Sequence, residues 1–245
     1  VFGVGYDGVD VAAAKARGVT VTHTPDVLND DVADLALALV LGISRQVARA
    51  DRFVRSGEWA NGPLALGRRV SGARLGLVGM GRIGQGIARR AAAFGMPVSY
   101  TARNARADLP YTYYPDAASL AAHSDYLVVI TPGGAATRHL IDAKVLRALG
   151  PKGILVNVAR GSVVDQPALV EALQKGEIAG AALDVFENEP DVPESLRAMP
   201  NVLLTPHMGS ATAQTRQAMA DLVVANLAAH FGGQPVPTAV PQCRA

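Results

Sequence analysis

Short apolar runs alternate with helical patterns from Leu75 onward, and this order leaves few folds open to the chain. The runs are rich in Val, Ile and Leu without polar alternation, as expected for parallel strands buried on both faces. Strands are predicted at Arg74–Val78, Pro97–Thr101, Tyr126–Thr131, Ile154–Val158, Gly180–Val185 and Val202–Thr205. Helices are predicted between them at Ile83–Phe94, Ala117–Ala122, Asp142–Ala148 and Pro167–Lys175. The alternation predicts an α/β fold with a doubly wound parallel sheet.

Two longer helical patterns lie before and after this region. The first, Asp30–Ser56, can be capped by Asn29 or Asp30 and carries apolar residues on several of its sides. A helix of that kind is buried within the protein or in an interface between subunits. The second, Ala213–Phe231, ends at Gly232-Gly233, and the prolines of the tail that follows disfavour further regular structure.

The composition argues against several classes of function. The 245 residues carry a formal net charge of only +2, and the basic pairs Arg68-Arg69 and Arg89-Arg90 contain no interleaved aromatic residues, so nucleic-acid binding is not expected. The apolar run Leu35–Ile43 is too short to span a bilayer. The single Cys243 cannot form an internal disulfide, which favours a cytoplasmic location, and no metal-site spacing of Cys or His is visible.

A glycine-rich loop follows the first strand of the alternating region and opens a helix. The segment Gly79-Met80-Gly81-Arg82-Ile83-Gly84 has the Gly-x-Gly-x-x-Gly spacing of dinucleotide-binding loops, in the strand–helix context that the motif requires. Gly79 permits the tight turn, Gly81 lets the backbone approach a pyrophosphate, and Gly84 allows close helix–strand packing. The N–H groups at the start of the helix would bind the phosphates. The alternative is a glycine-rich turn without a ligand.

The residues after the next strand favour NADPH over NADH. An acidic residue there would bind the ribose 2′-hydroxyl of NAD, whereas an arginine accommodates the 2′-phosphate of NADP. The chain has Ala102, Arg103 and Asn104 at this point, and no acid precedes Asp108. We therefore expect Arg103 and Asn104, with Arg106 close behind, to contact the phosphate. NAD is the alternative, with Arg103 a solvated loop residue.

Charged residues stand after three later strands, at the edge where ligands bind in open α/β sheets. Arg160 can hold a carboxylate by two parallel hydrogen bonds. His207 can transfer a proton near neutral pH, and Glu189 can orient that histidine. Asp184 ends another strand and could hold the nicotinamide carboxamide or the ribose. Each residue alone could be an ordinary loop group, but together with a nicotinamide they predict reduction of a 2-oxo acid.

Six segments together resemble the D-isomer-specific 2-hydroxyacid dehydrogenase family. They are Gly3–Asp7, Val32–Asp34, Gly79–Gly84, Asn157–Gly161, Leu183–Pro190 and Pro206–Ser210. Each segment alone is common, but the combination is specific. Arg103 makes the chain similar to the NADPH-preferring glyoxylate/hydroxypyruvate and hydroxyphenylpyruvate reductase branch.

The resemblance implies a role for each candidate residue. Arg160 would bind the substrate carboxylate and carbonyl, His207 would protonate the carbonyl oxygen as hydride arrives, and Glu189 would hydrogen-bond His207 and favour its cation. Backbone N–H groups of Val4 and Gly5 would also bind the substrate. The expected cofactor-binding residues are Gly79, Gly81, Arg82, Ile83, Gly84, Ala102, Arg103, Asn104, Thr131, Pro132, Val158, Asp184, His207 and Gly209.

The resemblance also implies two lobes. A dinucleotide-binding (Rossmann) domain is expected over residues 25–210, and residues 1–24 and 211–245 would belong to a flavodoxin-like substrate lobe. The chain opens in what the pattern predicts to be a strand end, and strands that should lie beside Val1–Val4 and Val19–Thr22 are absent from it. We therefore expect an N-terminal segment to be missing and the substrate lobe to be incomplete.

The expected activity is NADPH-dependent reduction of glyoxylate or hydroxypyruvate to the D-2-hydroxy acid. One alternative is an NAD-linked D-2-hydroxyacid dehydrogenase acting on another substrate, such as an arylpyruvate. Another is a non-catalytic, dinucleotide-sensing interaction protein. The resemblance implies a homodimer through the helix at Asp30–Ser56, and the apolar breadth of that helix agrees with this; Trp59 would lie either in the interface or packed in a loop. No metal ion, nucleic acid or membrane is expected as a partner.

Overall fold

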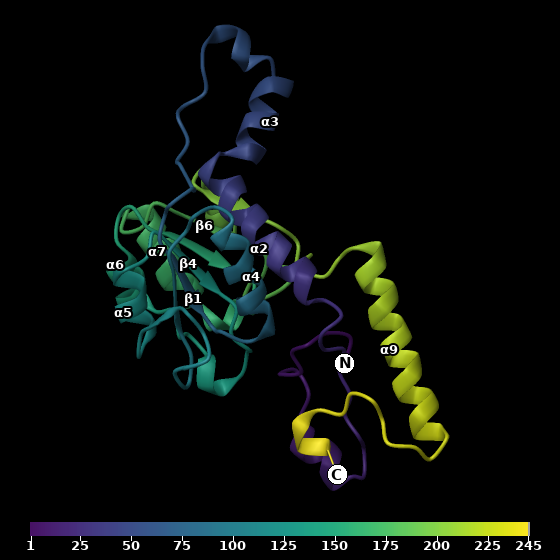
Figure 1. Ribbon diagram of the computed structural model, residues 1–245. Helices are drawn as coiled ribbons and strands as arrows, with labels where there is room; N and C mark the ends of the chain where they lie inside the picture. The colour runs from purple at the N-terminus through teal and green to yellow at the C-terminus, as the bar shows by residue number, and fades with distance from the viewer. Residues whose placement is uncertain (245) are drawn as a thin grey trace. The chain divides into compact units, whose positions relative to one another are not determined.

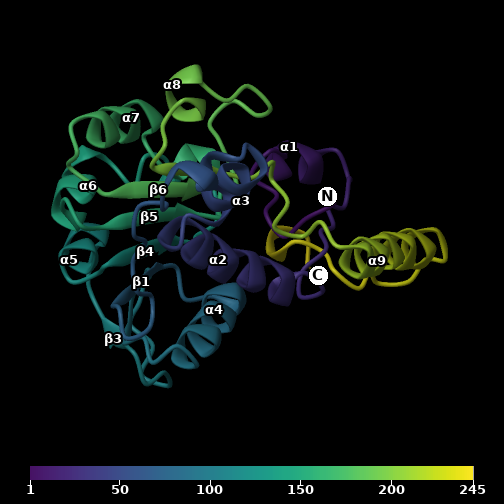
Figure 2. The same cartoon turned by 90° about the horizontal axis from the view of Figure 1, so that it is seen from above.

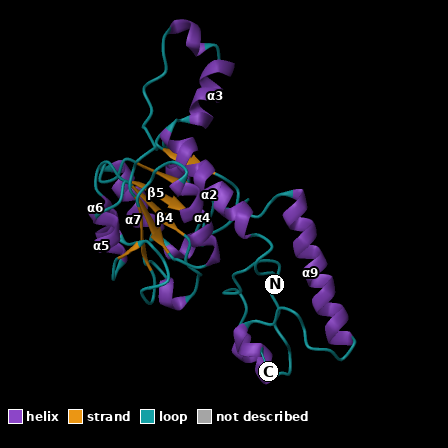
Figure 3. Cartoon of the chain, in the orientation of Figure 1, coloured by secondary structure: helices purple, strands orange, loops and turns teal. Residues whose placement is uncertain are grey.

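The chain divides into two compact units. The computed structural model describes residues 1–244. One unit comprises Val1–Val32 and Ser210–Ala245, and the other comprises Ala33–Gly209. All strands of the described residues lie in the second unit, whereas the first contains helices and loops (Figure 3). The lobe boundaries expected from the sequence, 1–24 with 211–245 and 25–210, stay a prediction.

The second unit is built on one parallel sheet. Its strands are β1 (Leu75–Val78), β2 (Val98–Thr101), β3 (Thr112–Tyr113), β4 (Tyr126–Val129), β5 (Ile154–Asn157), β6 (Gly180–Leu183) and β7 (Val202–Leu204). Their order is β3-β2-β1-β4-β5-β6-β7, and every pairing is parallel. The order reverses between β1 and β4, which creates the crevice where such sheets bind ligands. The predicted doubly wound α/β fold is therefore confirmed.

Helices cover both faces of this sheet. Figures 1 and 2 show α5 (Ala117–Ala122), α6 (Ala143–Leu149) and α7 (Gln166–Gln174) on one face, and α4 (Arg82–Ala92) with α2 (Asn29–Ser44) on the other. Each helix of the first group begins after an aspartate whose side chain accepts a backbone N–H bond of its first turn. Such caps stabilise a helix start by about 1 kcal/mol. The predicted positions of α4 to α7 agree with these bounds within two residues.

Burial on both faces explains why the strands lack polar alternation. All four residues of β4 are 0% exposed, and β1, β5 and β6 are buried throughout. The six predicted strands are all present, each shorter than expected by one or two residues. The edge strand β3 was not predicted, because its two residues form too short a pattern between Pro110 and Pro115.

The prediction of one continuous helix over Asp30–Ser56 is wrong. The chain forms α2 and then α3 (Val47–Arg55), separated at Gln46, whose φ of 53° is left-handed. The Gln46 side-chain amide donates hydrogen bonds to the carbonyls of Ala65 and Leu66 in the returning chain. These hydrogen bonds stabilise the helix break at Gln46, where the sequence contains neither glycine nor proline to indicate it. A short 3₁₀ turn, η1 (Glu58–Asn61), follows α3.

The first unit contains α1 (Val11–Ala16), α9 (Ala213–Phe231) and the 3₁₀ turn η4 (Pro241–Cys243). The helix α9 has the predicted bounds. The segments Val1–Val4 and Val19–Thr22, expected to be strands, form none, and Thr22 makes only an isolated bridge to Ala239. A ladder needs a partner strand to satisfy its backbone groups, and residues 1–244 place none there. No helix within residues 1–244 is long and apolar enough to cross a membrane.

Candidate active site

The glycine-rich loop joins β1 to α4 in the crevice of the sheet. Gly79 has a φ of 113°, and a Cβ there would approach the Ile130 carbonyl oxygen to 2.8 Å. A Cβ on Gly84 would collide with the Gly79 carbonyl, so the start of α4 lies directly on the loop. Both glycines are therefore required by close backbone approach: Gly79 also has the left-handed φ that suits the tight turn expected of it, and Gly84 makes the close packing expected of it.

The second glycine of the loop, Gly81, faces open space. It is the N-cap residue of α4, no side chain caps that helix, and a Cβ on Gly81 would meet nothing within 4 Å. The start of α4 thus has open space beside its N-cap residue, and no N-cap side chain binds its first N–H groups. An uncapped helix start beside a glycine cradle fits a pyrophosphate by charge and by shape.

The loop after β2 presents basic groups to solvent. Arg103 and Asn104 are both exposed, and no acid stands between them and Asp108. Arg106 is held more firmly: its N–H donates to the Tyr100 hydroxyl at 2.6 Å, and its guanidinium forms an ion pair with Asp108 at 2.6 Å. That ion pair lowers the pKa of Asp108 below its ordinary value. Because β2 lies beside β1, this loop follows the strand adjacent to the one that carries the glycine loop.

Asn157, the last residue of β5, shapes the turn that carries Arg160. Its side-chain amide donates to the Arg160 carbonyl at 3.0 Å, and its side-chain oxygen accepts from the Ala159 N–H at 3.0 Å. The Arg160 guanidinium donates to the Ala159 carbonyl at 2.8 Å. Asn157 is 1% exposed, so water does not reach its amide, and these two bonds satisfy the amide instead. The 3₁₀ turn η3 (Gly161–Val163) follows.

Gly161 brings the Arg160 turn against the loop after β6. A Cβ on Gly161 would overlap the backbone of Phe186 and Glu187. The two loops therefore touch through main-chain atoms. A glycine is required here by contact, since its φ is not left-handed.

Glu189 connects the loop after β6 to His207 in the loop after β7. One carboxylate oxygen accepts the Phe186 N–H at 3.0 Å, and the other lies 2.6 Å from His207 Nδ1. A carboxylate can only accept, so Nδ1 carries the proton of this bond and Nε2 is left for exchange with a second group. Both side chains are partly exposed, at 34% for Glu189 and 49% for His207.

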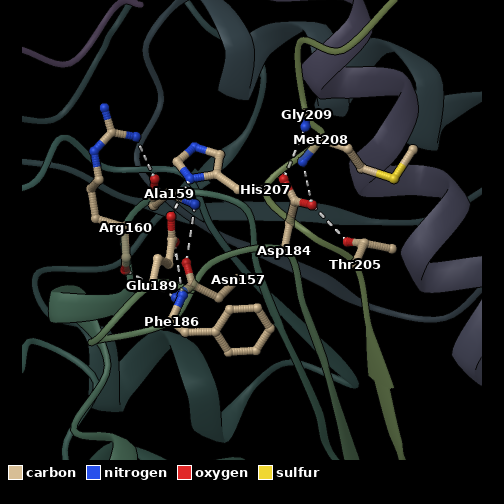
Figure 4. A network of polar contacts seen from close by, with 10 residues as sticks. All are labelled: Asn157, Ala159, Arg160, Asp184, Phe186, Glu189, Thr205, His207, Met208 and Gly209. Atoms are coloured by element: carbon tan, nitrogen blue, oxygen red, sulfur yellow. Dashed lines mark hydrogen bonds and ion pairs between the residues drawn. The ribbon is translucent and has the colours of Figure 1, made fainter. Parts of the chain in front are cut away.

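Asp184 holds the backbone on which His207 stands (Figure 4). Its carboxylate accepts from the Thr205 hydroxyl at 2.6 Å and from the Met208 and Gly209 N–H groups, each at 2.9 Å. The N–H of His207 donates to the Asp184 carbonyl at 2.8 Å, although His207 has a left-handed φ of 49°. Asp184 is 2% exposed, and burial raises its pKa although these hydrogen bonds oppose the shift.

The structure brings most of the predicted residues to one edge of the sheet. Arg160, Asp184, Glu189, His207 and Gly209 follow the carboxyl ends of the neighbouring strands β5, β6 and β7 (Figure 4). Thr131, Pro132 and Val158 follow β4 and β5 at the same edge, and the Val158 N–H donates to the Val129 carbonyl. Val4 and Gly5 belong to the other unit, where the Val4 carbonyl accepts from the His23 ring, so their proposed contact with substrate stays a prediction.

Sequence reasoning missed the residues that position this edge. They are Asn157, Gly161, Phe186, Thr205, and the pair His139 and Glu187, whose ring nitrogen and carboxylate lie 2.6 Å apart. Phe186 acts through its backbone N–H, Gly161 through its missing Cβ, and the Asn157 side chain binds backbone groups, so these roles leave little trace in residue types. The Asn at a buried strand end was the one visible signal.

The sheet, its switch point and the glycine loop define a dinucleotide-binding protein of the doubly wound α/β class. The family model for "D-isomer specific 2-hydroxyacid dehydrogenase, NAD binding domain" matches residues 37–209. The chain therefore belongs to the D-isomer-specific 2-hydroxyacid dehydrogenase family, as the sequence motifs suggested.

Individual relatives narrow the comparison. The chain is 51% identical over 239 residues to glyoxylate/hydroxypyruvate reductase A of Arabidopsis thaliana, covering 98% of this chain and 76% of that protein. The same figures hold for hydroxyphenylpyruvate reductase of Plectranthus scutellarioides. A solved NADPH-dependent glyoxylate/hydroxypyruvate reductase of Sinorhizobium meliloti, in complex with NADP and malonate, is 52% identical with a TM-score of 0.96, covering 100% of this chain and 78% of that one.

Proposed function

We propose that the protein is an NADPH-dependent reductase that converts a small 2-oxo acid, glyoxylate or hydroxypyruvate, to the D-2-hydroxy acid. The observation that carries this proposal is the 2.6 Å bond between Glu189 and His207 Nδ1, in loops adjoining the Arg160 turn. The bond orients His207 as a proton donor, and Arg160 nearby is a cation that can bind a carboxylate, both at the edge of the sheet where ligands bind. The names of the three relatives support the substrate class.

In this proposal each side chain does one task. Arg160 binds the carboxylate of the 2-oxo acid and polarises its carbonyl through charge-assisted hydrogen bonds. His207 Nε2 gives a proton to the carbonyl oxygen as that oxygen gains charge, and Glu189 keeps the ring oriented and stabilises its cation. The bound cofactor supplies the hydride. The protein contributes position and charge, and it does so with residues whose loops are held by hydrogen bonds to Asn157, Asp184 and Glu189.

The cofactor would lie along the glycine loop and the strand ends beside it. The uncapped start of α4, with Arg82 and Ile83 in its first turn, would bind the pyrophosphate. Arg103 and Asn104, after Ala102, would bind the 2′-phosphate, which supports NADPH over NADH. Beyond these, the cofactor would be lined by Thr131, Pro132, Val158, Asp184, His207 and Gly209.

A second substrate class has its own support. A relative with the same identity is named hydroxyphenylpyruvate reductase, which favours an arylpyruvate as the alternative to glyoxylate and hydroxypyruvate. Relative kcat/KM values for glyoxylate, hydroxypyruvate and phenylpyruvate decide between the two classes.

We also propose that the protein is a homodimer through α3 and η1. This arm and the chain returning from it extend from the sheet (Figure 1). Together they expose four large apolar residues, Val47 and Val54 of α3, Trp59 of η1 and Leu66 of the returning chain, at 56%, 55%, 66% and 96%. Apolar side chains gathered on an extended arm are typical of a surface covered by a partner subunit. Light scattering should give twice the subunit mass, and Trp59→Ser with Leu66→Ser should reduce it to that of one subunit. The expected cytoplasmic location rests on the single Cys243 alone.

The activity is tested with purified full-length protein by following NADPH oxidation. His207→Asn should lower kcat by about 100-fold or more, because the proton donor is lost, and Arg160→Lys should mainly raise KM, because the bidentate contact is lost. His123→Asn and Arg147→Lys, which change exposed residues outside the site, are the matched controls. Protein that binds NADPH but turns over none of the three substrates would exclude the reductase and favour a dinucleotide-sensing role.

A further inference from the structure

A histidine outside the proposed catalytic set joins three loops that follow the strands β4, β5 and β6. His139 lies in the loop after β4, two residues beyond the 3₁₀ turn η2 (Ala135–Thr137). Its Nε2 lies 2.6 Å from Glu187 Oε1, in the loop after β6. Its N–H donates at 2.9 Å to the carbonyl of Ser162, in the loop after β5. Since the carboxylate can only accept, Nε2 donates to Glu187.

The backbone conformation of His139 indicates that tertiary contacts fix the position of this residue. Its φ of 50° is left-handed, which is uncommon for a residue with a side chain. Such a conformation persists where the surroundings fix it, and it occurs most often near functional sites. Here the surroundings are the Ser162 and Glu187 bonds, and both partners are close in sequence to proposed catalytic residues: Ser162 to Arg160, and Glu187 to Glu189.

The position of Glu187 connects this contact to the proton donor. Glu187 is two residues before Glu189, in the short segment whose first N–H, that of Phe186, donates to the Glu189 carboxylate. The Glu187 N–H donates to the Gln166 side chain at 3.3 Å, and its side chain is 18% exposed. The segment 186–189 is thus fixed at Glu187 from two directions, while Glu189 reaches His207 from the same segment.

We propose that His139 is a positioning residue, which acts through Glu187 to hold Glu189 at hydrogen-bonding distance from His207. The inference rests on the proposed reductase activity. Loss of the contact lets the 186–189 segment shift, so the His207 ring is less well oriented when substrate is bound. The effect falls on the proton-transfer step, because Arg160 and the glycine loop keep their own supports.

The variant His139→Asn tests this with little change to the backbone. Asparagine tolerates a left-handed φ but is too short to reach Glu187, so the loop is kept and the contact is lost. We expect kcat to fall by about 10- to 100-fold, the loss typical of a small misplacement, with KM and the NADPH dissociation constant within about threefold of wild type. Glu187→Ala should give the same loss, and the double variant should lose no more than either single one.

Two matched variants separate the hydrogen bond from bulk or charge. Glu187→Gln retains an oxygen that can accept from His139 and should keep kcat within about threefold of wild type. Asp165 lies 3.9 Å from the other ring nitrogen and caps α7 through Ala168. Asp165→Asn retains the cap and should also keep kcat within about threefold, because the negative charge itself is not what orients Glu189.

A readout without turnover separates this inference from the proposed function. The His207 Nδ1 proton, in a 2.6 Å bond to Glu189, should give a downfield proton resonance, identified by its loss in His207→Asn. We expect His139→Asn to weaken or remove that resonance while the melting temperature stays near wild type. An unchanged resonance and unchanged kcat in folded His139→Asn would overturn the positioning role. Wild-type protein that keeps the resonance but shows no turnover would instead overturn the reductase.

Discussion

Two regions place charged groups at the carboxyl edge of the sheet. The first consists of the loops after β5, β6 and β7, and the second is the loop after β2. The first holds a buried charged group by hydrogen bonds, whereas the second leaves its charged groups exposed. At the first place Asp184 is 2% exposed and accepts three hydrogen bonds from the loop that carries His207. At the second, Arg103 is exposed, and the pair Arg106–Asp108 has side chains 43% and 61% exposed.

The difference shows how position and charge are supplied separately. Hydrogen bonds to the buried Asp184 fix the loop that carries the proton donor, and small changes in them are costly because water cannot readily replace them. An exposed cation needs only to be near a phosphate, and salt weakens its effect. In the first region, the loss of a single hydrogen-bonding atom should therefore have a large effect and ionic strength a small one. In the second region, ionic strength should have the larger effect.

The largest effect is expected from Gly161→Ala. The added Cβ would overlap the Phe186 and Glu187 backbone, so the Arg160 and Glu189 loops must separate. We expect activity to be lost and the free energy of unfolding to fall by about 4 kcal/mol or more, as for severe overpacking. Urea unfolding and steady-state kinetics measure both. Gly8→Ala, where a Cβ meets nothing within 4 Å, is the tolerated control, and a Gly161→Ala protein as active and stable as that control would refute the contact.

The next effect is expected from Asp184→Asn. Its amide nitrogen would face an N–H or hydroxyl donor now bound by a carboxylate oxygen, at a cost of about 1 to 3 kcal/mol. Kinetics should show a lower kcat, because the loop that carries His207 loses its anchor.

The pH dependence of stability provides a second readout for Asp184. Burial raises its pKa in the folded protein, so the stability that this group contributes is full below its unfolded pKa of about 3.9 and is lost as pH rises through the folded value. This part of the pH dependence should be absent in Asp184→Asn. Equal pH slopes in variant and wild type would contradict the assignment.

A smaller effect, confined to the cofactor, is expected from Arg103→Ser. Loss of a charge-assisted contact to the 2′-phosphate should weaken NADPH binding by about 10- to 100-fold and leave NADH binding unchanged. The difference between wild type and variant should shrink as salt is raised. Arg147→Ser, which changes an exposed arginine of α6, is the control. Equal loss for both cofactors would remove the phosphate contact from the proposal.

The smallest effect is expected at the opposite edge of the sheet, where Arg74 and Asp125 form an ion pair at 2.9 Å. The bonds from Arg74 lower the pKa of Asp125, so their stabilisation is present above the unfolded carboxyl pKa and is lost as pH falls through the folded value. The Arg74 side chain is 53% exposed, so solvent screening limits the contribution to about 1 kcal/mol or less. Asp125→Asn should lower stability near pH 7 and not near pH 2; a larger effect at low pH would contradict this sign.

The fold could be predicted from the sequence wherever burial alone determines it. The strands that form the sheet core are apolar on both faces and were found, and only their ends were too long. The break at Gln46 could not be predicted, because its cause is a pair of hydrogen bonds to Ala65 and Leu66, some 20 residues away. The prediction of strands in the first unit is wrong for a related reason, because a strand forms only beside a partner strand, and its own residue pattern does not specify that partner.

The site could be predicted only at the level of its chemistry. Arg160, Glu189 and His207 are visible because their residue types suit the reaction and follow strand ends. The contacts that orient them involve the Phe186 N–H, the Asn157 amide and the missing Cβ of Gly161. Backbone groups are the same in every residue, so the sequence does not reveal which of them will be used.

Asp184 binds the loop that carries His207 without using the side chain of Met208. Only the N–H of Met208 is bound to Asp184, while its side chain is 41% exposed. Substitutions of the Met208 side chain are therefore expected to leave the loop geometry unchanged. Substitutions there offer a way to change the local surface of the enzyme one side chain at a time without redesigning the backbone.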